Sequence, residues 1–301
     1  VGGKDNHLHA IDATTGEQQW TFSQSFGEVE SSPTVVDGTL YVGGIGGLYA
    51  VDAATGEREW QFSQPSRGVE SSPTVVDGTV YVGGYNKLYA VDAATGEQEW
   101  AFEQPSYGVE SSPTVVNGTV YVGIGRDTLY AVDAATGEQE WAFTQPYSPV
   151  ESSPTVANGT VYVGSEDANL YAVDAATGEQ EWAFETAIGV RSSPTVVNGT
   201  VYAGSDDGTL YAVDTATGQQ EWGFTEPSQG RGMESSPTVV NGTVYVGSGN
   251  FRNGTLHAVD AATGEREWAF TQPSGDVYSS PTVADGTVYV GSRDATLYAV
   301  D

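Results

Sequence analysis

The chain has 301 residues, of which 38% are hydrophobic, and it contains no cysteine. Its 40 acidic residues outnumber its 10 Lys and Arg residues, which gives a formal net charge of −30. These values exclude disulfides, thiolate catalysis and Cys-based zinc or iron–sulfur sites, and they argue against nucleic acid as a partner, because phosphates need a basic face. No apolar run is long enough for a transmembrane segment.

The acidic composition belongs to a folded chain, because seven Trp, seventeen Tyr and regular turn signals are not typical of disordered chains. A folded surface that is acidic and poor in lysine predicts life in concentrated salt, where counterions screen the self-repulsion. We therefore expect a halophilic, archaeal source.

The Trp residues recur about every 40 residues, which indicates one repeated supersecondary unit. One unit runs from Val69 to Phe102 and divides into four short strands. Its first strand, "SSPTVV", precedes Asp-Gly or Asn-Gly, which favours a type I′ hairpin turn. The next strands, "TVYVG" and "LYAVD", alternate apolar and polar residues; "ATG" then turns the chain into the fourth strand, "EQEWAF".

Four antiparallel strands per repeat predict an all-β fold, namely a β-propeller of four-stranded antiparallel blades. Each first strand contains a proline, which cannot donate to a ladder, so we expect this strand to be the edge that lines a central channel. The fourth strand carries Glu or Gln beside its Trp, as an exposed outer edge does.

The strands at the two ends of the chain set the number of blades. The "SSPT" strand and the Trp strand each occur seven times, whereas the "L-[YH]-A-[VI]-D" strand occurs eight times, from Leu8 to Leu297. We favour eight blades in a single propeller domain, residues 1–301, truncated within a blade at both ends. The alternative is seven blades, closed by pairing of residues 279–301 with the strand around Trp20.

The segment "AVDAATGEQEW" fits the pattern A-x-D-x-x-T-G-x-x-x-W, and all seven Trp-bearing copies match it. The chain thus resembles proteins with pyrroloquinoline-quinone (PQQ)-type repeats over nearly its whole length. The resemblance implies that each Trp docks between neighbouring blades, of which the family usually has eight. These structural docking residues are Trp20, Trp60, Trp100, Trp141, Trp182, Trp222 and Trp268.

The same family contains quinone-dependent dehydrogenases and non-catalytic propellers, including a lipoprotein that assists outer-membrane assembly, so the fold does not choose the function. The dehydrogenases carry long insertions, a vicinal disulfide at the cofactor and a calcium site. This chain has no Cys and hardly any insertion. No catalytic residue is therefore carried over, and PQQ is not expected as a cofactor.

Most repeated polar residues have a structural explanation. The Asp of "AVDAATG" is expected to cap its own turn through an Asx-type hydrogen bond. His9 and His257 replace the Tyr of "LYAVD"; His7 and His9 would share a strand face, but no third metal ligand is apparent, so we predict no metal site. Five Asn residues begin "NGT" sequons, four of them in hairpin turns, and glycosylation is the alternative for a secreted protein. They are Asn117, Asn158, Asn198, Asn241 and Asn253.

Eight of the ten basic residues fall in second-to-third-strand loops, in loops between blades or at the start of a first strand. A propeller places all of these on one face. One repeat has two longer loops there, "TEPSQGRGME" and "GSGNFRNG", and long loops on a rigid scaffold commonly bind ligands. The candidate binding residues in them are Arg231, Met233, Phe251 and Arg252. The alternative is that variable loops simply collect variable residues.

The residue before each "SSPT" enters the first strand at the same face. These residues predict a ring at the channel mouth, made of Glu30, Glu70, Glu110, Glu151, Arg191, Glu234 and Tyr278. Such a ring would hold a cation such as calcium or potassium, or a basic group, and the alternative is a solvated rim.

From these features we predict a non-catalytic binding or assembly module at the cell surface, extracellular, which presents one face to a protein or glycan partner. The alternatives are a PQQ-dependent oxidoreductase and a purely structural subunit of a surface assembly. No targeting sequence is visible.

Overall fold

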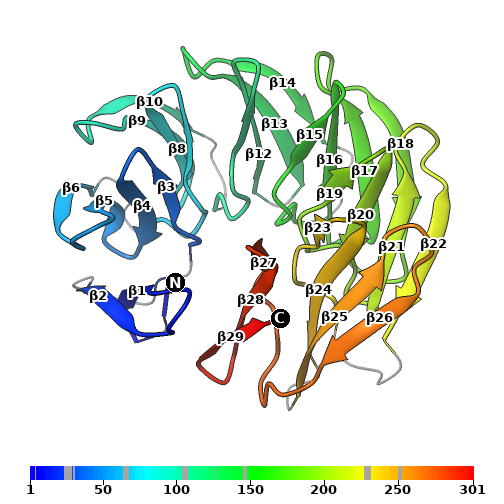
Figure 1. Cartoon of the computed structure of the whole chain (residues 1–301). Coiled ribbons are helices and arrows are strands. Elements are labelled where there is room, and N and C mark those ends of the chain that lie inside the picture. The colour runs from blue at the N-terminus through cyan, green and yellow to red at the C-terminus, as the bar shows by residue number, and fades with distance from the viewer. Residues whose placement is uncertain are drawn as a thin grey trace. The chain divides into compact units, whose positions relative to one another are not determined.

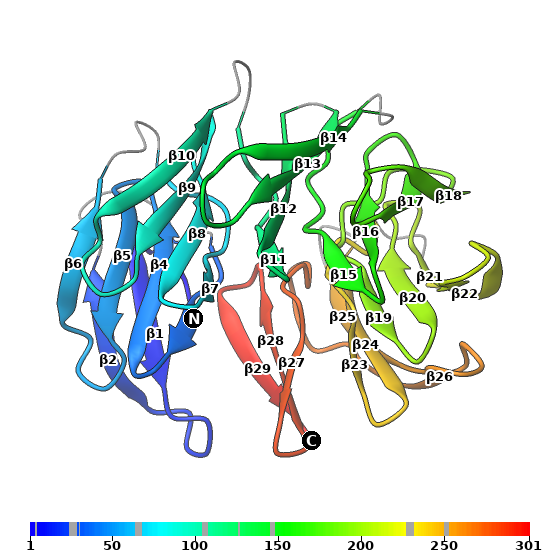
Figure 2. The same ribbon diagram turned by 90° about the horizontal axis from the view of Figure 1, so that it is seen from above.

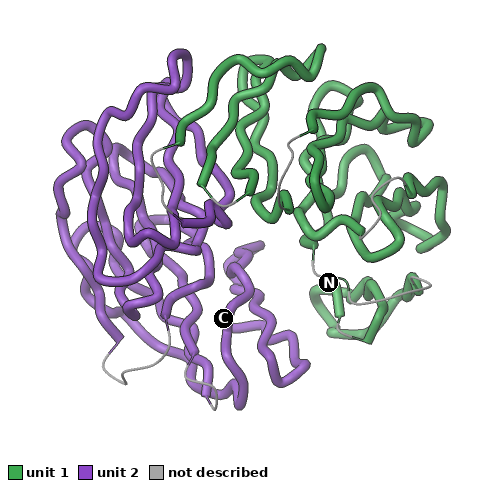
Figure 3. Tube along the Cα trace, turned by 180° about the vertical axis from the view of Figure 1, so that it is seen from behind, with its two compact units in different colours: residues 1–144 green, residues 145–301 purple. Residues whose placement is uncertain are grey.

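The computed structural model describes residues 1–3, 5–23, 29, 31–63, 68–103, 108–125, 127–144, 148–226, 232–249 and 253–301. These residues form 29 strands and no helix, so they include no helix that could span a membrane. The predicted domain over residues 1–301 divides into two compact units, residues 1–144 and 145–301 (Figure 3).

Unit 1 holds four sheets in chain order. Their strands are β1 (His7–Ile11), β2 (Gln18–Ser23), β3 (Thr34–Val36), β4 (Thr39–Gly44), β5 (Gly47–Asp52), β6 (Arg58–Phe62), β7 (Thr74–Val76), β8 (Thr79–Gly83), β9 (Lys87–Asp92), β10 (Gln98–Glu103), β11 (Thr114–Val116), β12 (Thr119–Ile124), β13 (Thr128–Asp133) and β14 (Gln139–Phe143).

Unit 2 also holds four sheets. Their strands are β15 (Thr155–Ala157), β16 (Thr160–Gly164), β17 (Asn169–Asp174), β18 (Gln180–Glu185), β19 (Thr195–Val197), β20 (Thr200–Gly204), β21 (Thr209–Asp214), β22 (Gln220–Thr225), β23 (Thr238–Val240), β24 (Thr243–Gly249), β25 (Gly254–Asp260), β26 (Arg266–Phe270), β27 (Thr282–Ala284), β28 (Thr287–Ser292) and β29 (Thr296–Val300).

Six of the described sheets have four antiparallel strands in chain order, and the sheets at the chain ends, β1–β2 and β27–β29, are partial. The prediction of an all-β propeller with four-stranded antiparallel blades is confirmed. The seven-bladed alternative would count β2, the strand around Trp20, as the fourth strand of β27–β29, and the favoured eight-bladed arrangement counts each partial sheet as a separate blade. The first and fourth strands are the edges of each four-stranded sheet, as the proline and glutamate patterns predict. Within unit 2, the first strands lie side by side and the fourth strands lie farthest from them (Figures 1 and 2).

The Asn-Gly and Asp-Gly hairpins have the predicted geometry. Asn117 and Gly118 have φ values of 53° and 84°, and Asp77 and Gly78 have values of 51° and 83°. Positive φ at both central residues is the signature of a type I′ turn, which Asn, Asp and Gly tolerate best. Asp and Asn are therefore interchangeable in this slot of the repeat.

The predicted Trp docking is visible between neighbouring sheets of one unit. Trp60 Nε1 donates to the carbonyl oxygen of Ala93 at 3.0 Å. The ring of Trp60 also lies against Gly96, where an added Cβ would come within 2.7 Å of it. Trp20, Trp100, Trp182 and Trp222 make the same hydrogen bond to the turn of the following blade. The Gly of "ATG" thus adopts the positive φ that its own turn needs, and its missing side chain leaves room for the Trp ring of the preceding blade.

The "SSPT" motif joins neighbouring blades, which the sequence pattern does not reveal. The backbone N–H of Ser153 donates to Ser193 Oγ in the next blade at 3.0 Å, and Thr155 Oγ1 donates to the carbonyl oxygen of Pro194 at 2.6 Å. The prolines lie immediately before the short first strands rather than inside them, as a correction to the prediction. Their carbonyl oxygens are acceptors for the preceding blade, so first strands are linked by side chains instead of a ladder.

Candidate functional site

The loops that enter each blade contact the second-to-third loops of the preceding blade. The backbone N–H of Val190 donates to the carbonyl oxygen of Ser165 at 2.9 Å, and that of Met233 donates to Ser205 at 2.8 Å. Within each unit, these two kinds of loop therefore share one face, as predicted. The Asn-Gly hairpins lie with the "AATG" turns, since the N–H of Ala175 donates to the carbonyl oxygen of Gly159 at 2.8 Å.

Arg191 joins three carboxylates on this loop face of unit 2. Its guanidinium lies 2.6 Å from Glu166 Oε1, 3.1 Å from Asp206 Oδ2 and 3.5 Å from Glu151 Oε2. Glu166 and Asp206 come from the second-to-third loops of two successive blades, and Glu151 enters the first of these blades. We call these four residues the Arg191 cluster. Three carboxylates and one guanidinium leave it negatively charged.

Asp206 is the most buried carboxylate of the Arg191 cluster, with a side chain that is 14% exposed. Its Oδ1 atom is buried and has no hydrogen-bond partner. Desolvation raises the pKa of Asp206, and Glu234 and Glu166 act in the same direction, while Arg191 opposes them. The cluster thus contains a carboxylate oxygen whose acceptor capacity is unmet.

Tyr278 stands at the same face before β27, two sheets along the chain from Arg191, which precedes β19. Its hydroxyl is buried without a hydrogen-bond partner, and Arg293 lies over its ring at 5.1 Å from the centroid. Burial, together with the charges of Glu234 and Asp276, raises the pKa of Tyr278 to about 12. The charge of Glu234 raises the pKa of both Asp206 and Tyr278, after the larger effect of burial.

The other residues of the predicted channel-mouth ring are not part of the Arg191 cluster. Glu70 and Glu110 are exposed at the corresponding positions of unit 1. Glu30 lies outside the described residues. No group of three or more described His, Asp or Glu side chains is arranged to hold a metal ion.

Of the four candidate loop residues, Arg231, Phe251 and Arg252 lie outside the part of the chain that the structure describes. Met233 is fully buried, in a cluster with Leu210 and Val244, so the expectation that it faces a ligand is wrong. The physical reason is its register. Met233 directly precedes a residue of the predicted ring, and other blades have Val190 or Val277 at this position. That slot points into the core.

Sequence reasoning missed Glu166 and Asp206, which complete the Arg191 cluster. Their signal is present in "GSEDAN" and "GSDDGT", where acidic residues follow the second strand. Partners for Arg191 become evident only when two such loops meet.

The blade with the longer loops contains a second polar cluster that the sequence did not indicate. His257 is 1% exposed, and its Nε2 lies 3.0 Å from Ser248 Oγ and 3.4 Å from Glu226 Oε2. Ser248 also donates a short hydrogen bond to Glu226. The His257 Nδ1 atom is buried without a partner. Two departures from the repeat signal this cluster: His257 replaces the usual Tyr, and Glu226 stands where the other repeats have Gln or Thr.

The other predicted polar positions are structural where their contacts are described. Asp174 Oδ1 accepts from the N–H groups of Ala176 and Thr177, as the Asx-turn prediction requires. His9 Nε2 pairs with Asp5 Oδ2 at 2.9 Å, while His7 Nδ1 lies 2.6 Å from the carbonyl oxygen of Asp5. Four sequon residues occupy exposed hairpin turns, and the fifth is exposed before β25; they are Asn117, Asn158, Asn198, Asn241 and Asn253.

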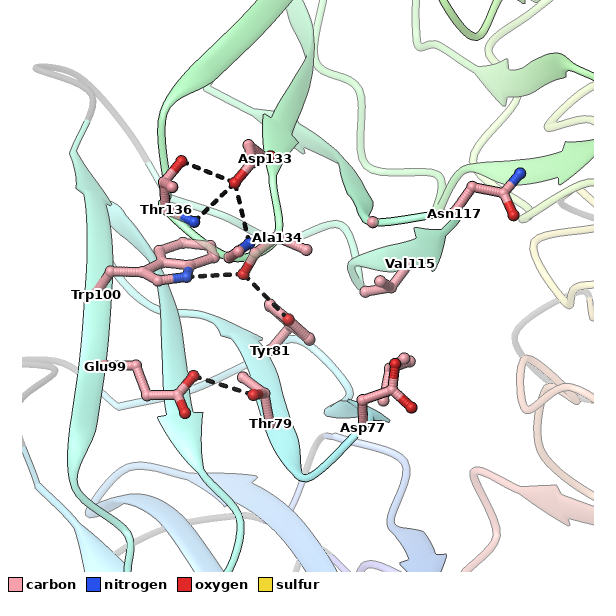
Figure 4. Close-up of a pocket in the computed structure, with 13 residues that line it drawn as sticks. Asp77, Thr79, Tyr81, Glu99, Trp100, Val115, Asn117, Asp133, Ala134 and Thr136 are labelled. Carbon is pink, nitrogen blue, oxygen red and sulfur yellow. Dashed lines mark hydrogen bonds between the residues drawn. The ribbon is translucent and has the colours of Figure 1, made fainter.

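Unit 1 contains a cavity of about 760 Å³ on the hairpin side, between the blade β7–β10 and the blade β11–β14 (Figure 4). Trp100 and Tyr81 form one part of its lining, and both donate hydrogen bonds to the carbonyl oxygen of Ala134. Asp77 and Asn117 lie at its other end, each in a hairpin turn.

The repeat, the sheets and the Trp docking define the class of this protein as a β-propeller with PQQ-like repeats. The family described as "Beta-alanine-activating enzyme, beta-propeller" matches residues 1–301. The chain therefore belongs to this family. No curated protein has a matching sequence.

Solved structures share the fold at low identity. BamB from Moraxella catarrhalis superposes with a TM-score of 0.81 at 19% identity, over 98% of this chain and 88% of BamB. The computationally designed Ika8 protein gives 0.86 at 17% identity, over 99% and 91%. The quinohemoprotein alcohol dehydrogenase ADHIIG from Pseudomonas putida HK5 gives 0.74 at 19% identity, over 90% of this chain and 64% of the enzyme. These similarities show the fold.

Proposed function

We propose that this propeller is a non-catalytic binding and assembly module at the surface of a halophilic cell. Its loop face would contact a protein or glycan partner. The observation that carries the proposal is the rim of unit 2, where Arg191 joins the loops of successive blades and leaves carboxylates at the same face. A rigid scaffold with variable loops is the usual arrangement of a binding surface.

The oxidoreductase alternative receives less support from the chemistry of the described residues. PQQ carries three carboxylates, so its site needs cationic or hydrogen-donating groups. The cavity in Figure 4 is lined by carboxylates, and Arg191 and Arg293 are already engaged with acidic partners. These residues do not fit the quinone, and we derive no reaction step through it. Absorbance and dye reduction after addition of PQQ and calcium test the alternative directly.

The halophilic part of the proposal rests on how few cations accompany the acidic surface. Outer-strand carboxylates accept from threonine hydroxyls instead, as Glu181 does from Thr160 at 3.1 Å and Glu221 from Thr200 at 2.9 Å. Screening by salt should then stabilise the fold. We expect the urea midpoint to rise as potassium chloride increases from about 0.1 M to the molar range. Maximal stability in dilute buffer would contradict this part of the proposal.

The binding function is tested with charge reversals in the two longer loops and, as a control, on the outer strands. The double variant Arg231→Glu, Arg252→Glu changes the two longer loops of the loop face. The matched control, Arg58→Glu with Arg266→Glu, changes two exposed cations on the outer strands β6 and β26. Immobilised proteins are incubated in molar potassium chloride with a cell-surface extract and with a glycan array. Loss of capture by the loop variant alone supports the proposal, and equal capture by all three proteins contradicts it.

A further inference from the structure

We infer that the cavity between the blades β7–β10 and β11–β14 is a binding site for a small organic ammonium ion. This site is separate from the loop face, because it opens among the Asn-Gly hairpins and "AATG" turns (Figure 4). Its volume of about 760 Å³ lies within the range of small-molecule sites.

The hydrogen-bond donors around the cavity are already used by the protein. Trp100 Nε1 and the Tyr81 hydroxyl both donate to the carbonyl oxygen of Ala134, at 2.9 Å and 3.2 Å. Thr79 Oγ1 donates to Glu99 Oε2 at 3.0 Å, and Thr136 Oγ1 donates to Asp133 Oδ1 at 2.8 Å. Among the lining side chains, the amide of Asn117 is the donor that remains. The cavity therefore offers acceptors and very few donors.

The charge of the lining has one sign. Asp77, Glu99 and Asp133 contribute carboxylates, and no Lys, Arg or His lines the cavity. Asp133 stays ionised because hydrogen bonds from Thr136 and Ala135 lower its pKa. An anionic ligand would be repelled here, and a neutral sugar, which needs donors as well as acceptors, would leave its own acceptors unmet.

The aromatic lining completes the match to an organic cation. Trp100 is half-buried and Tyr81 lies beside it, with ring centroids 5.9 Å apart. Tyr81 is only 5% exposed and Gly137 covers one face of the Trp100 ring, so the half-buried Trp100 supplies the accessible ring surface of the lining. Aromatic rings attract quaternary and primary ammonium groups through their quadrupoles, and carboxylates add Coulomb attraction. A bare metal ion would not use the rings.

The repeat itself supplies substitutions that change charge and keep the turn. Asp77 and Asn117 occupy the same hairpin slot with φ values of 51° and 53°. Asp77→Asn therefore removes one carboxylate, and Asn117→Asp adds one, with a residue that the chain already uses there. Asp285→Asn is the matched control, because Asp285 has the same slot and φ of 50° but does not line this cavity.

Choline is the probe, and its uncharged isostere dimethylbutanol is the control ligand. Binding is followed by NMR shifts of the indole N–H of Trp100, assigned with Trp100→Phe, at the lowest salt in which circular dichroism shows folded protein. We expect saturable shifts with choline and none with dimethylbutanol. Asp77→Asn should weaken choline binding by roughly three- to tenfold and Asn117→Asp should strengthen it similarly, as for a unit charge about 6 Å away in a hydrated site.

The Asp285→Asn control should bind choline like the wild type. Equal response to choline and dimethylbutanol, or choline affinities unchanged by both Asp77→Asn and Asn117→Asp, would overturn the inference. Loss of partner capture by the loop face is independent of either result.

Discussion

Trp182 Nε1 donates a hydrogen bond to the carbonyl oxygen of Thr215, 2.9 Å away in the next blade. Gly218, three residues further along the same turn, lies against the Trp182 ring with a φ of 67°. One turn therefore receives the preceding blade's Trp through both a polar and an apolar contact. Because the arrangement recurs from blade to blade within a unit, the Trp–turn contact is a general element of interblade stability.

Replacement of Gly218 by Ala should weaken this interface. The new Cβ would lie 2.8 Å from the Trp182 ring, in a backbone region that already disfavours side chains. Gly242→Ala is the control, because its φ of 85° carries similar strain with nothing within 4 Å of the new Cβ. We expect the Gly218 variant to lose about 1–3 kcal/mol more than the control in urea unfolding. Equal losses would show that the ring tolerates the methyl group.

Arg191→Met should destabilise the rim of unit 2 and change its pH dependence. The substitution removes the guanidinium that Glu151, Glu166 and Asp206 share, and we expect a loss of about 1 kcal/mol at neutral pH. Because the pKa of Asp206 in the folded protein lies above its usual 3.8, the folded state retains this proton longer than the unfolded state. The contribution of Asp206 to stability therefore falls as pH rises from its pKa in the unfolded chain to its higher pKa in the folded protein.

Without Arg191 the pKa of Asp206 rises further, so the decline should extend to higher pH than in the wild type. Thermal unfolding as a function of pH measures this effect. Arg266→Met is the control, since it removes an equal charge from β26, away from the rim. A parallel pH profile for the two variants would argue against coupling between Arg191 and Asp206.

The Asx turns should make the fold sensitive to acid. Hydrogen bonds from Thr177 and Ala176 lower the pKa of Asp174 below 3.8, so its contribution is present above that pH and is lost as pH falls through the lowered value. Asp174→Asn keeps the acceptor oxygen and removes the titration. The melting temperatures of wild type and the Asn variant should therefore differ less at about pH 3 than at about pH 6. A difference that grows in acid would contradict the assignment.

His257→Tyr should stabilise the blade with the longer loops. The ring of His257 packs edge-on against Phe224 at 5.3 Å, as Tyr211 packs against Phe184 at 5.2 Å. Tyrosine would keep this contact and remove the buried, unpartnered Nδ1. Because an unsatisfied buried polar group costs about 1–3 kcal/mol, we expect a gain of about 1 kcal/mol in urea unfolding.

His9→Tyr is the matched control for that exchange. His9 Nδ1 lies 3.1 Å from Gln18 Oε1, so no unmet group is removed. This variant should show no gain. A lower stability of His257→Tyr than of His9→Tyr would mean that the Ser248–Glu226 contacts of His257 outweigh its unpartnered nitrogen.

The amino-acid sequence by itself determined the class of fold, the order of the strands and the chemistry of the turns. These features follow from local physics repeated many times. Asp-Gly or Asn-Gly imposes a type I′ turn, and the Asp of "AVDAATG" caps its own turn. The alternation of the second and third strands wrongly predicted one exposed face, because β8, β9, β16 and β20 are buried at nearly every position. The prediction for Met233 was wrong, although its alignment with Val190 carries the signal for a buried position.

Only the tertiary structure decided which side chains of different blades meet. Arg191 reaches Glu166 and Asp206 because the loops of two blades converge on its first strand, and Ser153 bonds Ser193 because first strands lie side by side. The cavity beside Trp100 is likewise lined by residues of two blades, β7–β10 and β11–β14. Such contacts join segments far apart along the chain, so their partners are set by blade packing rather than by any local pattern.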